Sequence, residues 1–261
     1  MSTEKCISGI CATVLAGFGI PLPDGTDEPD SDVTALFGKE KIDRAVIYNP
    51  DAVAWYLREK YREAFKQAEE CSDITVRKRS VMPSVTPVCF ASMYTGLMPE
   101  KHGIMKYEKP VLTVDTLFDY MLKAGRKCAI VSTAGDSISK IFLERDMDYF
   151  IYPSKRRVNR KAASLIKSGA YDLLVVYNPD YDSIMHKHGP EDRRSLRALK
   201  ANLATYCDFV NLIKKHRKGE RVLYGFCPDH GCHEIDGGRG SHGLDMEEDM
   251  NVVHLYGVTE K

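Results

Sequence analysis

The sequence predicts an α/β fold, a three-layer α/β/α sandwich with a mostly parallel central sheet. Short apolar runs rich in β-branched residues alternate along the chain with longer stretches of helical periodicity, as expected of a sheet covered by helices on both sides. The 261 residues, 43% of them hydrophobic, suffice to bury one sizeable core. We therefore expect a single domain over residues 1–261, with an N-terminal segment and loop at 1–40 and the core at 41–261.

The expected strands are apolar runs bounded by turn residues. They are Ala45–Tyr48, Cys128–Val131, Leu173–Tyr177, Val222–Phe226 and Val252–Tyr256. Their hydrophobicity is continuous rather than alternating, which indicates strands buried on both faces, as in a parallel sheet.

The expected helices lie between these runs. Ala52–Glu70 is rich in good helix formers, Val114–Lys123 carries apolar residues at helical spacing, and Arg193–Arg217 is long and amphipathic. The basic run Lys155–Arg157 either meets an acidic substrate or begins a helix that faces water. Strands and helices in alternation predict a doubly wound sheet, whose functional residues collect beyond the carboxyl ends of the strands.

Composition excludes several classes of partner. Thirty-seven basic residues balance thirty-seven acidic ones, so no overall field attracts nucleic acid or an anionic membrane. The most apolar N-terminal stretch, Ile7–Ile20, is too short to span a membrane, and Met1–Lys5 is a poor start for a signal peptide. The segment Leu22–Asp32, with its Pro, Gly and acidic residues, reads as a loop. Eight cysteines without a regular framework predict reduced thiols and a cytoplasmic protein.

Histidines and aspartates recur at the spacing of metal ligands. The clusters are Asp182-x-x-x-His186, Asp229-His230-Gly231 and Ser241-His242-Gly243. Imidazole and carboxylate are ligands of Zn²⁺ and similar ions, and residues four apart on a helix point to the same side. Asp51, Asp182 and the Asp229-His230 pair each follow an expected strand, so we expect these side chains to meet in one crevice.

Each cluster also has a purely structural interpretation. An Asp and a His four residues apart occur by chance, and His188 competes with His186 as a ligand. Pro228 and Gly231 allow a simple turn around Asp229, and the glycine-rich surroundings of His242 allow a mobile surface loop.

The segment Pro83–Ile104 carries a further pattern, in which Thr86-Pro87 begins a helix and Thr95-Gly-Leu-Met-Pro-Glu-Lys-His-Gly-Ile104 follows. This segment resembles the nucleophile region of the alkaline phosphatase superfamily, specifically its nucleotide pyrophosphatase/phosphodiesterase-like branch. With the three ligand clusters, the resemblance covers most of residues 45–257.

The resemblance implies a site with two divalent metal ions, most commonly Zn, with Mn as the alternative. By position it assigns one ion to Asp182, His186 and His242, and the other to Asp51, Thr86, Asp229 and His230.

Thr86 is the implied nucleophile, attacking phosphorus and forming a phosphothreonine that water then hydrolyses. A divalent ion lowers the pKa of a hydroxyl, and a helix N-terminus offers free N–H groups to a phosphate. The structural alternative is that Thr86 caps the helix, with Pro87 at its first position.

Departures from the family pattern concern substrate binding. Cys89 stands where many relatives have Asn, and Met105-Lys106-Tyr107 stands where phosphodiesterases commonly keep an Asn that binds the phosphoryl oxygen. We expect Cys89, Lys106 and Tyr107 to take part in substrate binding.

The short segment between His230 and His242 replaces a long insertion of the relatives, which predicts a site open to water and hydrolysis rather than transfer. The expected function is therefore hydrolysis of a small phosphorylated substrate, with a phosphodiesterase favoured over a phosphomonoesterase. A phosphomutase of the phosphopentomutase or phosphoglycerate mutase type, and an inactive member that binds metal or phosphate, are the alternatives. The sequence leaves the oligomeric state open.

Overall fold

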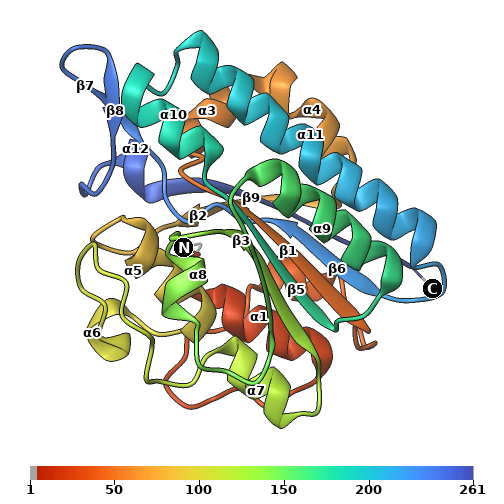
Figure 1. The fold of residues 1–261 in the computed structure, drawn as a ribbon. Coiled ribbons are helices and arrows are strands. Elements are labelled where there is room, and N and C mark those ends of the chain that lie inside the picture. The colour runs from red at the N-terminus through yellow and green to blue at the C-terminus, as the bar shows by residue number, and fades with distance from the viewer. Residues whose placement is uncertain (1–4, 261) are drawn as a thin grey trace.

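The central sheet of this computed structural model, which describes residues 5–260, has the strand order β2-β9-β6-β1-β5-β3-β4 (Figure 1). Its strands are β1 (Arg44–Pro50), β2 (Ile74–Arg79), β3 (Cys128–Thr133), β4 (Asp148–Tyr152), β5 (Leu173–Asn178), β6 (Val222–Phe226) and β9 (Asn251–Val258). β1 pairs in parallel with both β5 and β6, whereas β9 is antiparallel to β6 and to β2. The predicted mostly parallel sheet is confirmed.

Helices cover both faces of the sheet (Figure 1). One layer contains α3 (Trp55–Lys60), α4 (Arg62–Glu70), α9 (Lys155–Ser168), α10 (Asp180–His188) and α11 (Arg193–His216). The other contains α1 (Gly9–Phe18), α2 (Ser31–Ala35), α5 (Thr86–Thr95), α6 (Pro99–His102), α7 (Leu117–Lys123) and α8 (Ile138–Ile141). The hairpin of β7 (His233–Ile235) and β8 (Arg239–Ser241), with α12 (Glu247–Met250), lies near α10.

The strands bury both of their faces because successive side chains point to opposite helix layers. In β1, Ala45 and Ile47 join the apolar cluster that contains α1, α5 and α7, whereas Val46 and Tyr48 join the cluster that contains α9 and α11. This double burial produces the continuous apolar runs of the sequence. The apolar run at 252–256 lies in β9, which is antiparallel to its neighbours. A continuous apolar run therefore indicates that a strand is buried on both faces, not that it is parallel.

Two edge strands were not predicted. β2 contains three basic residues, and β4 pairs on only one side. β2 lacks the apolar run on which the prediction depends, whereas β4 contains such a run at residues 149–152 that the prediction missed.

The single helix predicted over Ala52–Glu70 is wrong. The chain forms α3 and α4, separated at Tyr61, whose φ of −114° and ψ of 43° are not helical. The predictions over 114–123 and 193–217 correspond to α7 and α11 with shifts of a few residues at the ends. A capping box of Thr116 and Asp119 places the start of α7.

The N-terminal segment forms α1, which packs against α5 and α7. Ile10, Val14 and Phe18 of this helix are buried in the same apolar cluster as the sheet. No helix within residues 5–260 is both long enough and apolar enough to cross a membrane. All eight cysteines are free thiols.

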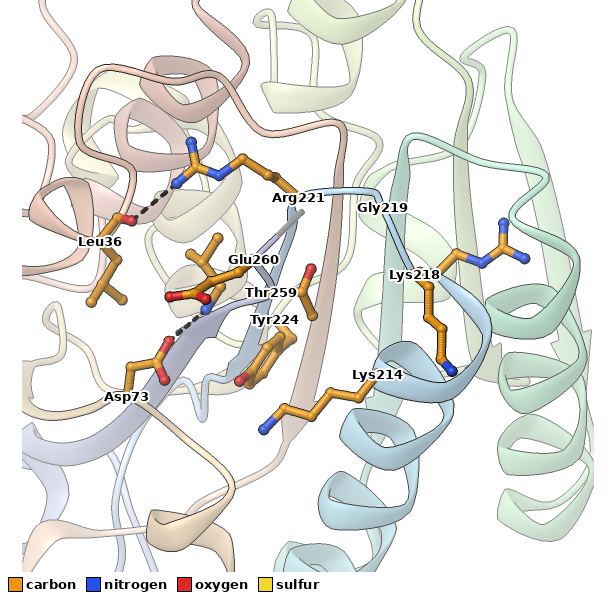
Figure 2. A pocket seen from close by; sticks show the side chains of 11 residues that line it. Leu36, Asp73, Lys214, Lys218, Gly219, Arg221, Tyr224, Thr259 and Glu260 are labelled. Atoms are coloured by element: carbon orange, nitrogen blue, oxygen red, sulfur yellow. Dashed lines mark hydrogen bonds between the residues drawn. The ribbon is translucent and has the colours of Figure 1, made fainter.

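A cavity of about 710 Å³ opens where α11 ends and β6 begins, at the amino ends of the parallel strands (Figure 2). Two of its basic side chains already have backbone partners. Arg221 donates to the Leu36 carbonyl at 3.3 Å, and Lys214 donates to the Cys71 carbonyl at 3.4 Å. The predicted site residues lie at the opposite edge of the sheet.

Candidate metal centre

The candidate ligands follow three neighbouring strands. Asp51 comes directly after β1, Asp182 lies near the start of α10 after β5, and Asp229 and His230 follow β6. Because β1 lies between β5 and β6 and all three are parallel, their carboxyl ends share one edge of the sheet. His242 arrives at the same place from the segment that follows β8.

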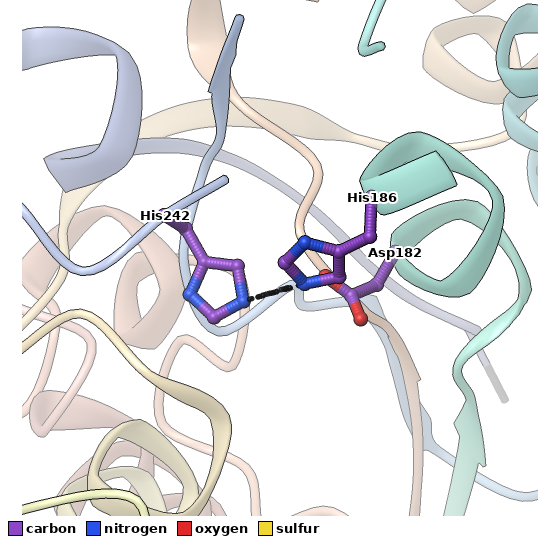
Figure 3. Close-up of side chains that lie close together, drawn as sticks. All are labelled: Asp182, His186 and His242. Carbon is purple, nitrogen blue, oxygen red and sulfur yellow. Dashed lines mark hydrogen bonds and ion pairs between the residues drawn. The ribbon is translucent and has the colours of Figure 1, made fainter. Parts of the chain in front are cut away.

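The outer group consists of Asp182, His186 and His242 (Figure 3). The Nε2 atoms of the two histidines lie 3.1 Å apart, and Asp182 Oδ1 lies 3.2 Å from His186 Nε2 and 3.5 Å from His242 Nε2. The side chain of His186 is 41% exposed, so this group is open to solvent.

The inner group consists of Asp51, Asp229 and His230, which are buried. His230 Nε2 lies 3.4 Å from Asp51 Oδ1 and 3.4 Å from Asp229 Oδ2. The hydroxyl of Thr86 lies 3.3 Å from the same Nε2 atom. The rings of His230 and His242 stack with their centres 3.9 Å apart, which places the two groups side by side.

Each histidine in the two groups bonds through Nδ1 to a backbone carbonyl. His186 contacts the carbonyl of Gly240, His242 that of Ser84, and His230 that of Gly231, each at 2.9 Å. A carbonyl only accepts, so Nδ1 carries the proton and each neutral ring directs the Nε2 lone pair into its group. Metal-ligating histidines typically make such a hydrogen bond through the ring nitrogen that does not bind the metal, and the bond fixes the orientation of the ring.

One carboxylate oxygen of each aspartate in the two groups is buried without a hydrogen-bond donor. These atoms are Asp51 Oδ1, Asp182 Oδ1 and Asp229 Oδ2, and each is the oxygen that faces a histidine Nε2. Burial raises the pKa of Asp51 well above its ordinary value, and burial raises that of Asp229 to about 8. A cation would supply the charge that these buried oxygens lack.

The spacing of the ligand atoms fits a tetrahedral cation. In a tetrahedral zinc site with bonds of about 2.0–2.1 Å, the ligand atoms lie about 3.3 Å from one another. The measured separations of 3.1–3.5 Å in the outer group and 3.3–3.4 Å around His230 agree with that value.

The backbone around Asp51 is constrained. Ala52 has a φ of 64°, a left-handed conformation that is costly for a residue with a side chain. In this conformation the Ala52 N–H points at Asp229 Oδ1, 3.4 Å away. The hydroxyl of Tyr177, at the end of β5, donates to Asp51 Oδ2. Tyr177 was not predicted as a site residue, because nothing in the sequence shows that its hydroxyl reaches a neighbouring strand.

Thr86 is the first residue of α5, and Val85 occupies the cap position. The structural alternative, in which Thr86 caps the helix, therefore misses the cap position by one residue. The Val85 carbonyl accepts the N–H groups of Val88 and Cys89, each at 3.0 Å. The Thr86 hydroxyl faces the inner group instead of the helix.

The predicted substrate-binding residues make no described contact with a side chain of the two groups. Cys89 is fully buried, with its thiol 3.1 Å from the Ser80 hydroxyl, so a substrate arriving from solution does not reach it. This placement argues against the expected contact of Cys89 with substrate. Tyr107 is 62% exposed, and Lys106 pairs with Glu108 at 3.6 Å. Neither makes a described contact with a residue of the inner or outer group.

Comparison with known sequences decides the family. The profile of the type I phosphodiesterase/nucleotide pyrophosphatase family matches residues 45–255. The chain belongs to this family. The matched region contains Thr86 and all members of the inner and outer groups, and the predicted alkaline phosphatase-like branch is confirmed. No curated protein sequence matches the chain.

Several solved structures share the fold. Human ectonucleotide pyrophosphatase/phosphodiesterase 5 has a TM-score of 0.63 at 13% identity, over 82% of this chain and 87% of that one. An inactive threonine-to-alanine variant of the murine protein in complex with AMP has a TM-score of 0.57 at 14% identity, over 75% of this chain and 59% of that one. Phosphonoacetate hydrolase from Sinorhizobium meliloti 1021, in complex with phosphonoformate, has a TM-score of 0.56 at 16% identity, over 75% and 59%. The chain thus spans less than two thirds of the last two structures.

Proposed function

We propose that this chain is a metal-dependent hydrolase of phosphoric esters that uses Thr86 as its nucleophile. The observation that carries the proposal is the position of the Thr86 hydroxyl, 3.3 Å from His230 Nε2 and at the start of a helix. Asp182, His186 and His242 would hold one divalent ion, and Asp51, Thr86, Asp229 and His230 a second. Zinc suits this mixture of imidazole and carboxylate best, and manganese is the alternative.

Three observations support the proposal. The family contains type I phosphodiesterases and nucleotide pyrophosphatases. Structures of related fold bind AMP and phosphonoformate, and a variant of the murine protein that replaces one threonine by alanine is inactive. Within this chain, three unpaired buried carboxylate oxygens and three oriented imidazole rings form the donor set that two cations require.

Each residue of the site has a separate role in the proposed reaction. Divalent ions at this site would supply the positive charge that lowers the pKa of the Thr86 hydroxyl and neutralises the phosphoryl oxygens. The Thr86 oxygen attacks phosphorus in line with the leaving group, and the positive end of the α5 dipole stabilises the negative charge on the phosphoryl oxygens. The phosphoryl group then stays on Thr86 until water attacks phosphorus and restores the hydroxyl.

The substrate we propose is a small phosphorylated compound such as a nucleotide, with diesters favoured over monoesters. The exposed His186 and the short β7-β8 hairpin leave the outer group open to water. Access of water favours hydrolysis over transfer of the phosphoryl group to another position of the substrate, the reaction of a mutase. Inactive members of an enzyme family have commonly lost some of the metal ligands. The complete donor set of this chain therefore favours an active enzyme.

Substitution of the nucleophile tests the proposal. We expect Thr86→Ala to lower the turnover of p-nitrophenyl phosphodiesters and monoesters by about 10³-fold or more while the bound metal remains. Thr86→Ser keeps a hydroxyl and is the matched control, expected to retain measurable turnover. Full activity of Thr86→Ala would contradict the nucleophile assignment, and a sugar phosphate converted to its isomer rather than to free phosphate would indicate a mutase.

A further inference from the structure

The edge strand β4 is open on one side. β4 pairs with β3 through Ala129–Thr133 on its inner side and ends the strand order of the sheet. Within residues 5–260, no backbone hydrogen bond reaches its outer side. Unpaired N–H and C=O groups along a strand are a template for another strand.

The opposite edge of the same sheet is covered at one end by the chain itself. The Ile7 N–H donates to the Arg79 carbonyl at 2.9 Å, and the Arg79 N–H donates to the Lys5 carbonyl at 2.8 Å, so the N-terminal segment pairs with the last residue of β2. β2 also carries the exposed Arg77, whose charge opposes pairing with another chain.

β4 has neither form of protection. Residues 149–152 are Tyr, Phe, Ile and Tyr, a sequence of high β propensity that is only half-buried and contains no charge. Phe150 and Tyr152 contact the helix layer of α9, whereas Ile151 belongs to neither apolar cluster. An edge of this kind is normally paired, covered or blocked.

Charges of opposite sign flank the two ends of β4. Glu144 and Asp146 precede the strand and are exposed, whereas Arg156 and Arg157 follow it and are exposed. None of these four side chains makes an ion pair in the described part of the chain. The two arginines lie in the first turn of α9, where a positive charge opposes the helix dipole and does not stabilise the helix.

We propose that β4 pairs with β4 of a second copy of this chain, antiparallel and about a two-fold axis near Phe150. In this arrangement the acidic residues that precede one strand lie near the basic residues that follow the other. A parallel arrangement would place like charges together and would not close by symmetry. The contact forms one continuous sheet through both copies and leaves both metal centres at the carboxyl edge of their strands.

Charge reversal tests the arrangement with the full chain in sedimentation velocity, from about 1 to about 100 µM. The acid-reversed variant carries Glu144→Lys and Asp146→Lys, and the base-reversed variant carries Arg156→Glu and Arg157→Glu. We expect the unchanged protein to dimerise and each variant alone to dissociate about tenfold more readily or worse, because like charges then meet twice. An equimolar mixture of the two variants should dimerise again, since both contacts between unlike copies are then attractive.

Substitution of one residue by lysine on each edge strand gives a matched pair of variants. Ile151→Lys on β4 should abolish the dimer, whereas Thr75→Lys on β2 should leave it intact. Circular dichroism spectra that are the same in all variants would exclude misfolding. Recovery of the dimer in the mixture of the two charge-reversed variants also requires that both are folded. A monomer at every concentration, or a dimer that survives Ile151→Lys and both reversals, would overturn the proposal.

Discussion

The Nε2 atoms of His186 and His242 lie 3.1 Å apart, and each ring contacts a backbone carbonyl through its Nδ1 atom. Two neutral rings held in this way direct lone pairs at each other, which is unfavourable without a positive charge between them. The nearby carboxylate of Asp182 raises the pKa of His186, which favours a proton on this ring when no metal is bound. A divalent ion would supply it for both rings and for Asp182 together.

Two ions per chain are expected from the two groups. Asp182→Asn removes a charged ligand from the outer group, and Asp229→Asn does the same in the inner group. Protein purified without added metal should contain two equivalents of zinc, and each variant about one, as measured by elemental analysis. Asp245→Asn is a control, because Asp245 pairs with Arg79 on the surface and belongs to neither group. Two ions retained in both variants would contradict the ligand assignment.

The two groups should lose their ions at different rates. Side chains of the outer group are up to 41% exposed, whereas those of the inner group are at most 2% exposed. A chelator reaches an ion only through solvent, so removal should follow a fast and a slow phase. Asp182→Asn should eliminate the fast phase alone; loss of the slow phase in that variant would be inconsistent with this assignment.

Tyr177 should act as a positioning residue for Asp51. Its hydroxyl donates to Asp51 Oδ2, and the opposite oxygen of that carboxylate belongs to the inner group. We expect Tyr177→Phe to weaken one of the two zinc affinities by about 10- to 100-fold, the usual effect of removing a partner of a ligand. Titration with a metal indicator measures this change.

A second buried tyrosine provides the control for Tyr177→Phe. Tyr206 bonds through its hydroxyl to Ser72 and contacts no residue of either group. Tyr206→Phe should lower stability without changing zinc affinity. Equal losses of affinity in the two variants would show that the effect comes from packing rather than from the hydrogen bond to Asp51.

Much of this centre could be predicted from the sequence. Strand ends can be read from apolar runs, and parallel neighbours bring their carboxyl ends together, so Asp51, Asp182, Asp229 and His230 were expected in one place. The partners that orient them could not be predicted in this way. The carbonyls of Gly240 and Ser84 are backbone atoms that every residue possesses, and their contacts depend on how loops pack in three dimensions.

The substrate-binding predictions show the same limit. Cys89 lies one helical turn after Thr86, but the turn directs its thiol toward Ser80 and the core. Sequence position placed the residue near the site without showing which way its side chain points. The edge strand β2 could not be predicted from an apolar run, because half of its residues are basic.

A buried ion pair should make stability depend on pH at the acid end. Asp30 lies 2.7 Å from Lys5 Nζ and 2.5 Å from Lys78 Nζ, with its own side chain fully buried. Burial acts to raise the pKa of Asp30, but the charge of Lys78 and the hydrogen bonds of both lysines outweigh it and lower the pKa to about 2. The stabilisation is therefore complete above about pH 4 and is lost as the pH falls toward 2.

Urea unfolding of Asp30→Asn measures this contribution. At neutral pH we expect a loss of about 3 kcal/mol in the free energy of unfolding, because Lys78 is left buried without its partner. The difference from the unchanged protein should shrink between about pH 4 and pH 2. Asp245→Asn, which removes a surface pair, should cost less than about 1 kcal/mol at every pH. A difference that stays constant down to pH 2 would rule out the assigned pair.

The most direct test of the central claim is to find the phosphoryl group on Thr86. Protein turning over a p-nitrophenyl phosphoester is quenched with acid, digested, and its peptides are fragmented in a mass spectrometer. The account predicts a covalent phosphoryl adduct on Thr86 that is absent from Thr86→Ala. An adduct on Ser84 or on another residue, or an active enzyme that never carries the adduct, would contradict it.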